Sequence, residues 1–453
     1  MKNIFLLFLI ILLRTVYPQE FGMGLNLDDP KFEASPLSAP LMRGDYENLP
    51  DSASLKEFSP HPGHQGSYGT CTAWASAYAA RTILEAFKNR WSRDETDKNA
   101  FSPSFVYNQI RAIKDCSTGA SLIDALNLLR DAGDMKLSEF GYDCSREVTD
   151  QDKLKANPYK ILEYREIAGR STENKHRFVK KSLAENKPVV LAFDCPLSFI
   201  SAKEAWMPDT ADYKEWRRGH AITAVGYNDN KFGGAIEVIN SWGNKWGKDG
   251  FTWIRYKDFD FFCKLAFELI DKSQNDSSKV DLSGSLIFKE STGREMKARY
   301  NGEFFIMEKP YPSNTVFELR ISNNEPAYVY AFSSDLTFKT YKIFPFTERM
   351  LAYLPYRQNN VAIPDEESYN VLDTIPGISY FCFIYSKEAL NLDSLMKIVE
   401  KGKGTFYDRI VSAFKDRMVS KKDVELKYKD GIIFSARSRG KTLIPVLVAI
   451  KHL

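Results

Sequence analysis

The stretch "HPGHQGSYGTCTAWASAYAA", residues 61–80, places one cysteine between a glycine-containing turn and a run of small residues. Apolar side chains recur at helical spacing from 71 to 91, which predicts an amphipathic helix with Thr70 as its cap and Cys71 in its first turn. A cysteine in such a place is often an inert core residue, although the N-terminus of a helix also stabilises a thiolate. The rest of the chain must therefore decide between a core residue and a nucleophile.

A cysteine nucleophile needs a base for its proton, a group that orients the base, and a donor for the developing oxyanion. The sequence contains five histidines, at positions 61, 64, 176, 220 and 452. Only His220 begins a strand-like run, "GHAITAVGY", and Asn240 ends the next such run, "AIEVIN". Because consecutive strands usually pair, we expect the side chains of His220 and Asn240 to meet.

Three segments carry a family resemblance. "QGSYGTCTAW", "GHAITAVGY" and "NSWGNKWGKDGFTWIRY" resemble, in this order, the active-site blocks of the papain-like cysteine peptidases, in a bacterial-type variant. The resemblance covers about residues 49–270. His220 follows Cys71 by 149 residues and Asn240 by 169, so only the second distance slightly exceeds the family's range of about 130–150. The resemblance implies two lobes, one helical and one barrel-like, with a cleft between them.

The resemblance also implies roles for individual residues. Cys71 would be the nucleophile and His220 its base and later its acid, the two resting largely as a thiolate–imidazolium pair. Asn240 would orient His220, and Trp242 would shield their hydrogen bond from water. Gln65 would donate its amide to the oxyanion. The reaction would hydrolyse peptide bonds through an acyl-enzyme, without a metal or an organic cofactor.

Substrate contacts are expected at four residues: Thr118, Gly119, Gly219 and Trp242. The usual glycine pair of the substrate loop is replaced by Thr118 and Gly119, whose backbone can still pair with an extended peptide. Gly219 precedes the histidine and leaves that wall of the pocket without a side chain. The expected partner is therefore a protein or peptide substrate.

The active-site loop departs from the family pattern. Tyr68 and Thr72 stand where many relatives have a cysteine and a tryptophan, so the disulfide that anchors this loop is absent. Cys116 resembles the other half of that disulfide, and Cys144 is its alternative partner. A weaker alternative pairs the remaining cysteines of this region, Cys195 and Cys263.

The "HPGH" segment has the appearance of a metal cluster. Its two histidines, His61 and His64, lie in a Pro-Gly loop with no further ligand type nearby, which favours a solvated loop over a metal site.

The first 48 residues indicate export. Residues 1–19 contain Lys2 and the apolar run Ile4–Leu13, which is too short to span a bilayer and predicts a signal peptide of a secreted or periplasmic protein. Residues 20–48 are expected to be a leader or short propeptide that crosses the cleft, the alternative being that no zymogen exists.

The net charge of +3, from 62 basic and 59 acidic residues, gives no reason to expect nucleic acid as a partner, and no other segment predicts a membrane span.

The remainder of the chain is rich in strand patterns. Residues 271–284 are polar and are expected to be a linker. Residues 285–453 predict a β-sandwich accessory domain with one helix near 405–419, loosely resembling a bacterial domain of unknown function found behind enzyme domains, and Cys382 is expected in its core. This domain would either bind a protein or surface partner or stabilise the protease by packing. The whole chain is therefore expected to be α+β.

Two other classes of function remain open. An acyl-transferase or transpeptidase would form the same acyl-enzyme and pass it to another acceptor. A non-catalytic binding protein could use a protease-like scaffold, although the filled positions Cys71, His220, Asn240 and Gln65 argue against it.

Overall fold

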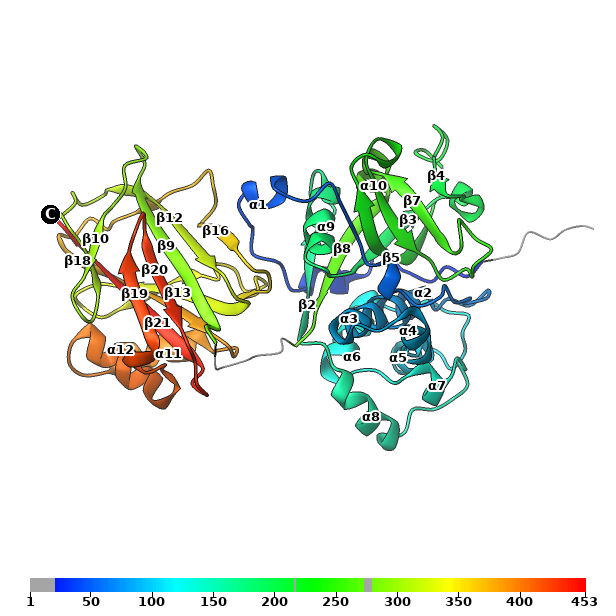
Figure 1. Ribbon diagram of the computed structural model, residues 1–453, viewed down its shortest axis with the longest axis horizontal. Helices are drawn as coiled ribbons and strands as arrows, with labels where there is room; N and C mark the ends of the chain where they lie inside the picture. The colour runs from blue at the N-terminus through cyan, green and yellow to red at the C-terminus, as the bar shows by residue number, and fades with distance from the viewer. Residues whose placement is uncertain (1–20, 216, 273–278) are drawn as a thin grey trace, which may run out of the picture.

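The computed structural model describes residues 21–215, 217–272 and 279–453, and Figure 1 shows them as two bodies joined side by side. The predicted signal peptide, residues 1–19, and the middle of the predicted linker 271–284 lie outside the described residues. None of the helices in the described ranges is both long and apolar enough to cross a membrane.

The first body combines helices with a mixed sheet, as the predicted α+β class requires. Its main helices are α2 (Cys71–Ala73), the π-helical segment η3 (Trp74–Arg81), α3 (Thr82–Asn89), α4 (Arg93–Lys98), α5 (Pro103–Ile110), α6 (Leu122–Asp131), α7 (Leu137–Phe140), α8 (Asp150–Ala156), α9 (Lys175–Ala184) and α10 (Tyr256–Phe262). Its strands are β1 (Ser52–Ser54), β2 (Glu163–Ala168), β3 (Val189–Cys195), β4 (Ala205–Trp206), β5 (Arg218–Asn228), β6 (Ala235–Ile239), β7 (Phe251–Arg255) and β8 (Cys263–Ile270). The path through the sheet is β2-β8-β3-β5-β6-β7-β4, with β1 paired to β5.

Both faces of this sheet are covered, which explains why its central strands, such as β3, are mostly apolar. On one face, Phe105 and Leu126 of the helical lobe share a core with Phe267 of β8. On the other face, α9 and α10 pack with a group of aromatic side chains that includes Trp242. Strands buried on both faces have no polar alternation, and every residue of β3 is buried. In Figure 1 the helical lobe lies below the sheet and its covering helices.

The helix predicted over 71–91 is present, but it is not uniform. It begins at Cys71, passes through the π-helical segment η3, and ends at Asn89, where Arg90 adopts a left-handed conformation. Thr70 occupies the N-cap position, yet its side chain makes no capping hydrogen bond. The capping prediction was therefore wrong, because the Thr70 hydroxyl bonds to the hydroxyl of Tyr142 instead, at 2.9 Å.

The second body is β-rich. Its strands are β9 (Leu282–Glu290), β10 (Ala298–Tyr300), β11 (Phe305–Met307), β12 (Val316–Asn323), β13 (Ala327–Ser334), β14 (Thr340–Phe344), β15 (Tyr353–Leu354), β16 (Asn359–Ile363), β17 (Asn370–Val371), β18 (Gly377–Ser386), β19 (Val424–Tyr428), β20 (Ile432–Ala436) and β21 (Leu443–His452). Two sheets, β10-β11-β21-β18-β13-β14 and β16-β12-β9-β20-β19, contribute side chains to one hydrophobic core. β9 begins at Leu282, inside the predicted linker.

Two helices, and not the single predicted one, cover this second body. α12 (Phe406–Phe414) corresponds to the predicted helix, and α11 (Leu392–Lys401) was missed. Leu392, Leu395 and Val399 of α11 are buried at spacings of three and four, so helical periodicity does mark this segment. Both helices pack over a core that contains Cys382, as predicted.

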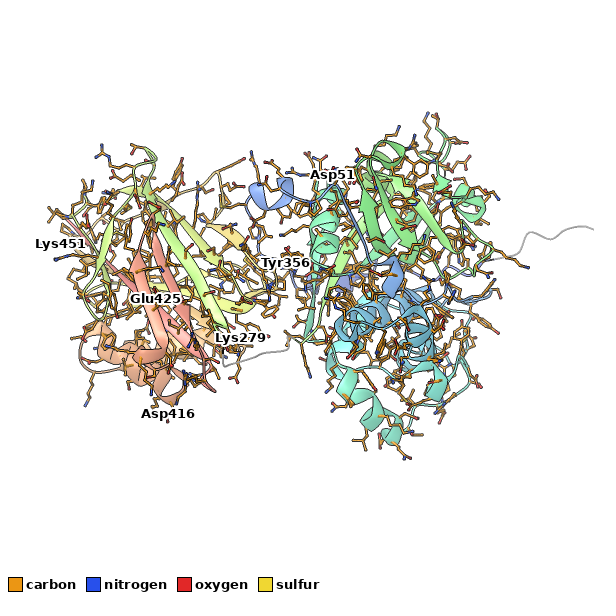
Figure 2. All side chains as sticks on the ribbon, in the orientation of Figure 1. Asp51, Lys279, Tyr356, Asp416, Glu425 and Lys451 are labelled. Atoms are coloured by element: carbon orange, nitrogen blue, oxygen red, sulfur yellow. A yellow bond between two sulfur atoms is a disulfide. The ribbon has the colours of Figure 1, made fainter. Side chains whose placement is uncertain are left out.

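A buried polar cluster joins the two bodies. Glu268 of β8 pairs with Arg165 of β2 at 3.2 Å and accepts a hydrogen bond from Ser182 at 2.5 Å. Tyr356 of the second body, which Figure 2 labels at the boundary, also donates its hydroxyl to Glu268. Since these groups are withdrawn from water, their mutual bonds are needed to offset the cost of burying the charges.

The leader passes through the same boundary. Leu37 forms β-bridges both to Glu166 of β2 and to Met350 of the second body. Its N–H donates to the carbonyl oxygen of Arg349 at 2.8 Å. The leader backbone therefore fills the space between a sheet edge of the first body and a loop of the second.

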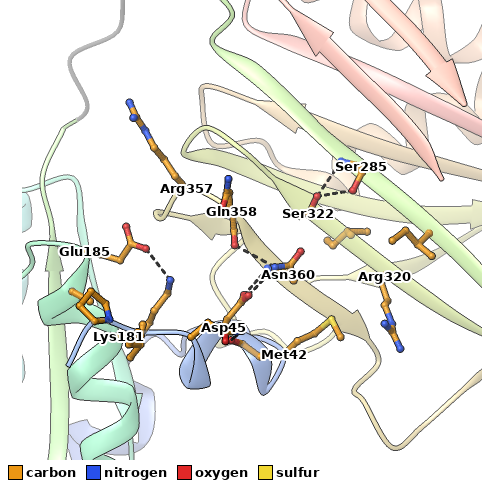
Figure 3. A pocket seen from close by; sticks show the side chains of 17 residues that line it. Met42, Asp45, Lys181, Glu185, Ser285, Arg320, Ser322, Arg357, Gln358 and Asn360 are labelled. Carbon is orange, nitrogen blue, oxygen red and sulfur yellow. Dashed lines mark hydrogen bonds and ion pairs between the residues drawn. The ribbon is translucent and has the colours of Figure 1, made fainter. Parts of the chain in front are cut away.

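Further along, the leader becomes part of the second body. Ala39 and Leu41 are buried in the core of the two C-terminal sheets. Both carboxylate oxygens of Asp45, in α1 (Gly44–Glu47), accept hydrogen bonds of 2.7 Å from Asn360, as Figure 3 shows. This half of the leader cannot leave without opening that core.

Candidate active site

The helix that begins at Cys71 is held against the strand that carries His220. Thr223, three residues after His220 on β5, donates its hydroxyl to the carbonyl oxygen of Ala75 at 2.8 Å. Ala75 lies in the π-helical segment, where the regular helical hydrogen-bond pattern is broken and carbonyl groups can accept bonds from outside. This bond ties the helix that begins with Cys71 to the strand that carries His220.

The pairing of His220 with Asn240 that the sequence predicts is present. β5 and β6 are antiparallel neighbours, and Nε2 of His220 lies 2.8 Å from Oδ1 of Asn240. Because Oδ1 of an amide can only accept, Nε2 carries the proton. Nδ1 of His220 is buried and has no hydrogen-bond partner among the described residues. Trp242 stacks on the His220 ring at 4.6 Å between centroids, where it excludes water from the His220–Asn240 bond.

Gln65 is fixed so that one amide proton points into the site. Its Oε1 accepts a hydrogen bond from the Ser241 hydroxyl at 2.5 Å, and its Nε2 donates to the carbonyl oxygen of Tyr68 at 2.7 Å. The second proton on Nε2 is directed to the carbonyl oxygen of Gly22, at 3.0 Å. This arrangement suits a donor that stabilises an oxyanion.

Burial controls the protonation of the thiol and the imidazole. Cys71 and His220 are both fully inaccessible to water. Burial raises the pKa of the Cys71 thiol, although the backbone N–H groups of Ala221 and Gly24 oppose this shift. Burial lowers the pKa of His220 to about 4, while the hydrogen bond to Asn240 acts in the opposite direction. In this covered state the neutral pair is favoured, and not the thiolate–imidazolium pair expected from the sequence.

The leader is what covers the site. The N–H of Gly24 donates to Sγ of Cys71 at 3.4 Å, and the carbonyl of Gly22 occupies the position at Gln65. The ring of Phe21 stacks on Trp242 with centroids 4.8 Å apart. The leader backbone is thus hydrogen-bonded both to Cys71, the expected nucleophile, and to Gln65, the expected oxyanion donor.

Three of the four expected substrate-binding residues, Gly119, Gly219 and Trp242, contact this leader. The N–H of Leu25 donates to the carbonyl oxygen of Gly219 at 3.3 Å. A Cβ on Gly119 would lie 1.8 Å from the carbonyl oxygen of Gly24, so only glycine permits this approach. Thr118 contributes its backbone to the neighbouring turn, where its carbonyl accepts a hydrogen bond from Tyr107 at 2.5 Å.

The cysteine pairing is settled for four residues. Cys116 and Cys144 form a disulfide, which was the preferred alternative. Cys195 and Cys263 are both buried and free, so the second proposed pair was wrong. They lie on adjacent strands, but each thiol instead contacts a carbonyl oxygen close to it in sequence, at 3.8 Å for Cys195 and 3.5 Å for Cys263.

Three residues of the site were not singled out from the sequence: Ser241, Thr223 and Tyr142. Ser241 directly follows Asn240, so adjacency was an available signal for it. Thr223 lies on the same strand as His220, but nothing in the sequence shows which helix it contacts. Tyr142 is distant from every motif and could not be found without the fold.

Comparison with known proteins agrees with this geometry. Residues 60–270 match the description "Papain family cysteine protease". The matched residues include Cys71, His220 and Asn240. An uncharacterized peptidase C1-like protein of Acanthamoeba polyphaga mimivirus is 28% identical over 209 residues, which cover 43% of this chain and 63% of that protein. Cysteine proteinase 3 of Entamoeba histolytica is 31% identical over 98 residues, covering 21% and 32%. The chain thus spans less than two thirds of the length of these curated relatives.

Solved papain-like structures are also similar to this chain. Xylellain, a cysteine protease from Xylella fastidiosa, has a TM-score of 0.45 and 24% identity, covering 56% of this chain and 97% of its own. Digestive procathepsin L 3 of Tenebrio molitor larval midgut has a TM-score of 0.42 and 17% identity, covering 52% and 76%.

Proposed function

We propose that this chain is an exported cysteine endopeptidase with a β-sandwich accessory domain, which hydrolyses peptide bonds through a thioester on Cys71. The hydrogen bonding of His220 is the observation that supports it most. Asn240 holds the proton of Nε2, and the unpartnered Nδ1 is left to accept the thiol proton. The match of residues 60–270 to the papain family supports the same chemistry.

The reaction proceeds in two halves. In the first, the sulfur of Cys71 bonds to the substrate carbonyl carbon, and Nδ1 of His220 takes the thiol proton. Gln65 donates to the oxyanion, the C–N bond breaks, and the amine leaves with the proton from His220. In the second half, His220 takes a proton from water and the hydroxide adds to the thioester carbon. The C–S bond then breaks, the acid leaves, and His220 returns its proton to the sulfur of Cys71.

We further propose that residues 21–27 keep this enzyme latent. A productive substrate must present one carbonyl group both to Sγ of Cys71 and to Nε2 of Gln65. In the leader, Gln65 binds the carbonyl of Gly22 whereas the thiol is bonded to the N–H of Gly24, two residues further on. The leader therefore lies in a register in which it blocks attack and is not itself attacked.

The glycines of the leader offer a test of this block. A Cβ on Gly22 would lie 1.8 Å from the carbonyl oxygen of Tyr68, and one on Gly24 would lie 2.2 Å from that of Gly69. The double variant Gly22→Ala, Gly24→Ala should expel the leader from a full-length chain and raise turnover of a fluorogenic peptide at least tenfold. Gly44→Ala is the matched control, because its nearest neighbouring atom is 4.0 Å away. Equal activity of wild type and double variant would contradict latency.

Labelling with a peptide fluoromethylketone tests the nucleophile. In the Gly22→Ala, Gly24→Ala chain we expect one label, located at Cys71 by peptide mapping and absent after Cys71→Ala. His220→Ala should abolish turnover. Labelling that survives Cys71→Ala, or wild-type turnover of His220→Ala, would rule out these assignments. Analysis of the products with an added amine acceptor separates hydrolysis from acyl transfer.

Export is proposed from the apolar run in residues 1–19. N-terminal sequencing of protein recovered outside the cytoplasm would locate the cut, which we expect near residues 15–19. Retention of the full N-terminus in the cell would contradict export.

A further inference from the structure

We infer that Tyr142 is a positioning residue for the oxyanion site, because its phenol joins the two ends of the loop that runs from Gln65 to Thr70. This inference rests on the proposed function, since the separation between Gln65 and Cys71 matters only if Cys71 attacks a carbonyl group. Neither the motifs nor the family resemblance points to this tyrosine.

Two hydrogen bonds carry the inference. The Tyr142 hydroxyl donates to the backbone carbonyl oxygen of Gln65 at 3.0 Å. It also lies 2.9 Å from Oγ1 of Thr70, the residue directly before Cys71. A phenol has one proton, and the Gln65 carbonyl can only accept, so the Thr70 hydroxyl donates in the second bond. One side chain therefore links the residue bearing the oxyanion donor to the residue that precedes the nucleophile.

The loop itself needs such a support. It contains two glycines, Gly66 and Gly69, and Gly66 has φ of +70°, so its backbone is intrinsically adaptable. Two backbone bonds hold one end of the loop each: the N–H of Gln65 donates to the Ser241 carbonyl at 2.8 Å, and the N–H of Gly69 donates to the Cys116 carbonyl at 2.8 Å. Within the loop, Nε2 of Gln65 also donates to the Tyr68 carbonyl at 2.7 Å, but this bond does not reach Thr70. Among the hydrogen bonds of the described residues, those of the Tyr142 hydroxyl connect Gln65 at one end of the loop with Thr70 at the other.

Tyr142 is in turn well anchored. Its ring packs edge-on against Trp74, with centroids 5.0 Å apart. Two residues later, Cys144 forms the disulfide to Cys116, whose carbonyl holds Gly69. The disulfide therefore restrains both groups that hold the loop, the Tyr142 hydroxyl and the Cys116 carbonyl. Burial raises the pKa of Tyr142, which keeps the phenol protonated and able to donate.

A double-mutant cycle tests whether Tyr142 acts through Gln65. All variants are made in the full-length Gly22→Ala, Gly24→Ala chain, so that the leader does not limit access. Tyr142→Phe should lower kcat/KM about tenfold, mainly through kcat, because displacement of a catalytic donor by a fraction of an ångström is costly. In a chain that already carries Gln65→Ala, the same change should have less than a twofold effect.

Two reagents distinguish a misplaced oxyanion donor from a general loss of structure around Cys71. Inhibition by a peptide aldehyde, whose adduct carries an oxyanion, should weaken in parallel with kcat/KM. Alkylation of Cys71 by iodoacetamide needs no oxyanion donor and should stay within twofold of its rate in the parent chain. Tyr78→Phe is the matched control, since it removes a phenol that donates to a backbone carbonyl, that of His61 at 2.6 Å, outside the loop. Its kcat/KM should be unchanged.

The inference is overturned if Tyr142→Phe keeps the parent kcat/KM, if alkylation falls as much as turnover, or if the losses from Tyr142→Phe and Gln65→Ala multiply. If Tyr142→Phe does not fold, Thr70→Val removes only the second bond, and the same pattern of turnover against alkylation decides the matter. A parent chain without any turnover or Cys71 labelling would instead refute the proposed peptidase itself.

Discussion

Burial under the leader changes the acid–base behaviour of His220. The pKa of its imidazole is lowered to about 4 in the covered state, whereas an exposed histidine titrates near 6.5. Any state in which His220 meets water therefore binds a proton more tightly than the covered state does. As the pH falls below 6.5 the open state gains stability, and this gain levels off at roughly 3 kcal/mol below pH 4.

Acid should therefore loosen the leader. Hydrogen exchange measured on a Cys71→Ser chain, which cannot process itself, should show protection of residues 21–27 falling between pH 6.5 and 4, after correction for intrinsic exchange rates. The control His220→Gln carries no titrating group at this position, so the extra loss of protection should disappear. An identical pH profile in both chains would show that His220 is not the group responsible.

The Thr223 hydroxyl joins the helix that begins at Cys71 to the strand that carries His220, and its bond can be removed cleanly. Thr223→Val keeps the shape of the side chain but removes the donor to the Ala75 carbonyl. We expect a loss of about 1–2 kcal/mol in unfolding free energy, because a buried carbonyl is left without its partner. We also expect a fall in kcat, since the thiol and imidazole are no longer held in register.

Thr252→Val is the matched comparison. Thr252 lies on β7, and its hydroxyl donates to the Lys203 carbonyl at 2.8 Å, a bond that does not involve the helix of Cys71. Both variants should lower the melting temperature, but only Thr223→Val should lower kcat in the Gly22→Ala, Gly24→Ala chain. Equal kcat values for the two variants would show that the Thr223 bond does not position the catalytic groups.

The residues that do chemistry were more readable from the sequence than the residues that hold them. Cys71, His220, Asn240 and Gln65 were predicted from the sequence because the proposed reaction requires these residue types in a recognisable order. The hydroxyls of Tyr142 and Thr223 act through contacts between segments far apart in the chain, and no local pattern records such contacts. Thr70 illustrates the limit, since its type and place suit a helix cap but tertiary contact with Tyr142 redirects its hydroxyl.

The two bodies and the leader together determine how activation can occur. Ala39 and Leu41 are part of the C-terminal core, and Leu37 bridges both bodies, so the second half of the leader is retained by the fold. The segment between the active site and this anchor contains the exposed residues Asn26, Asp28, Pro30 and Lys31. We expect the activating cut to fall between residues 26 and 31, because a protease needs an accessible and locally unfolded backbone.

Intact mass and N-terminal sequencing of the activated enzyme check this expectation. The new N-terminus should lie between residues 27 and 32, and residues 32–48 should remain with the protein under native conditions. Activation that removes residues 32–48 while both bodies stay folded would contradict the role given to the C-terminal core. This arrangement could not be predicted from the sequence, because the apolar residues of the leader follow no sustained periodicity and nothing local shows that two of them enter a distant core.

Trapping the acyl-enzyme tests the central claim most directly. The Gly22→Ala, Gly24→Ala chain is mixed with an activated peptide ester, quenched in acid within milliseconds to seconds, and digested for mass spectrometry. We expect a thioester with the mass of the acyl group on the peptide that contains Cys71, and its loss when Cys71→Ala is introduced. Turnover of the ester without any adduct on Cys71, or with the adduct on another residue, would contradict the account.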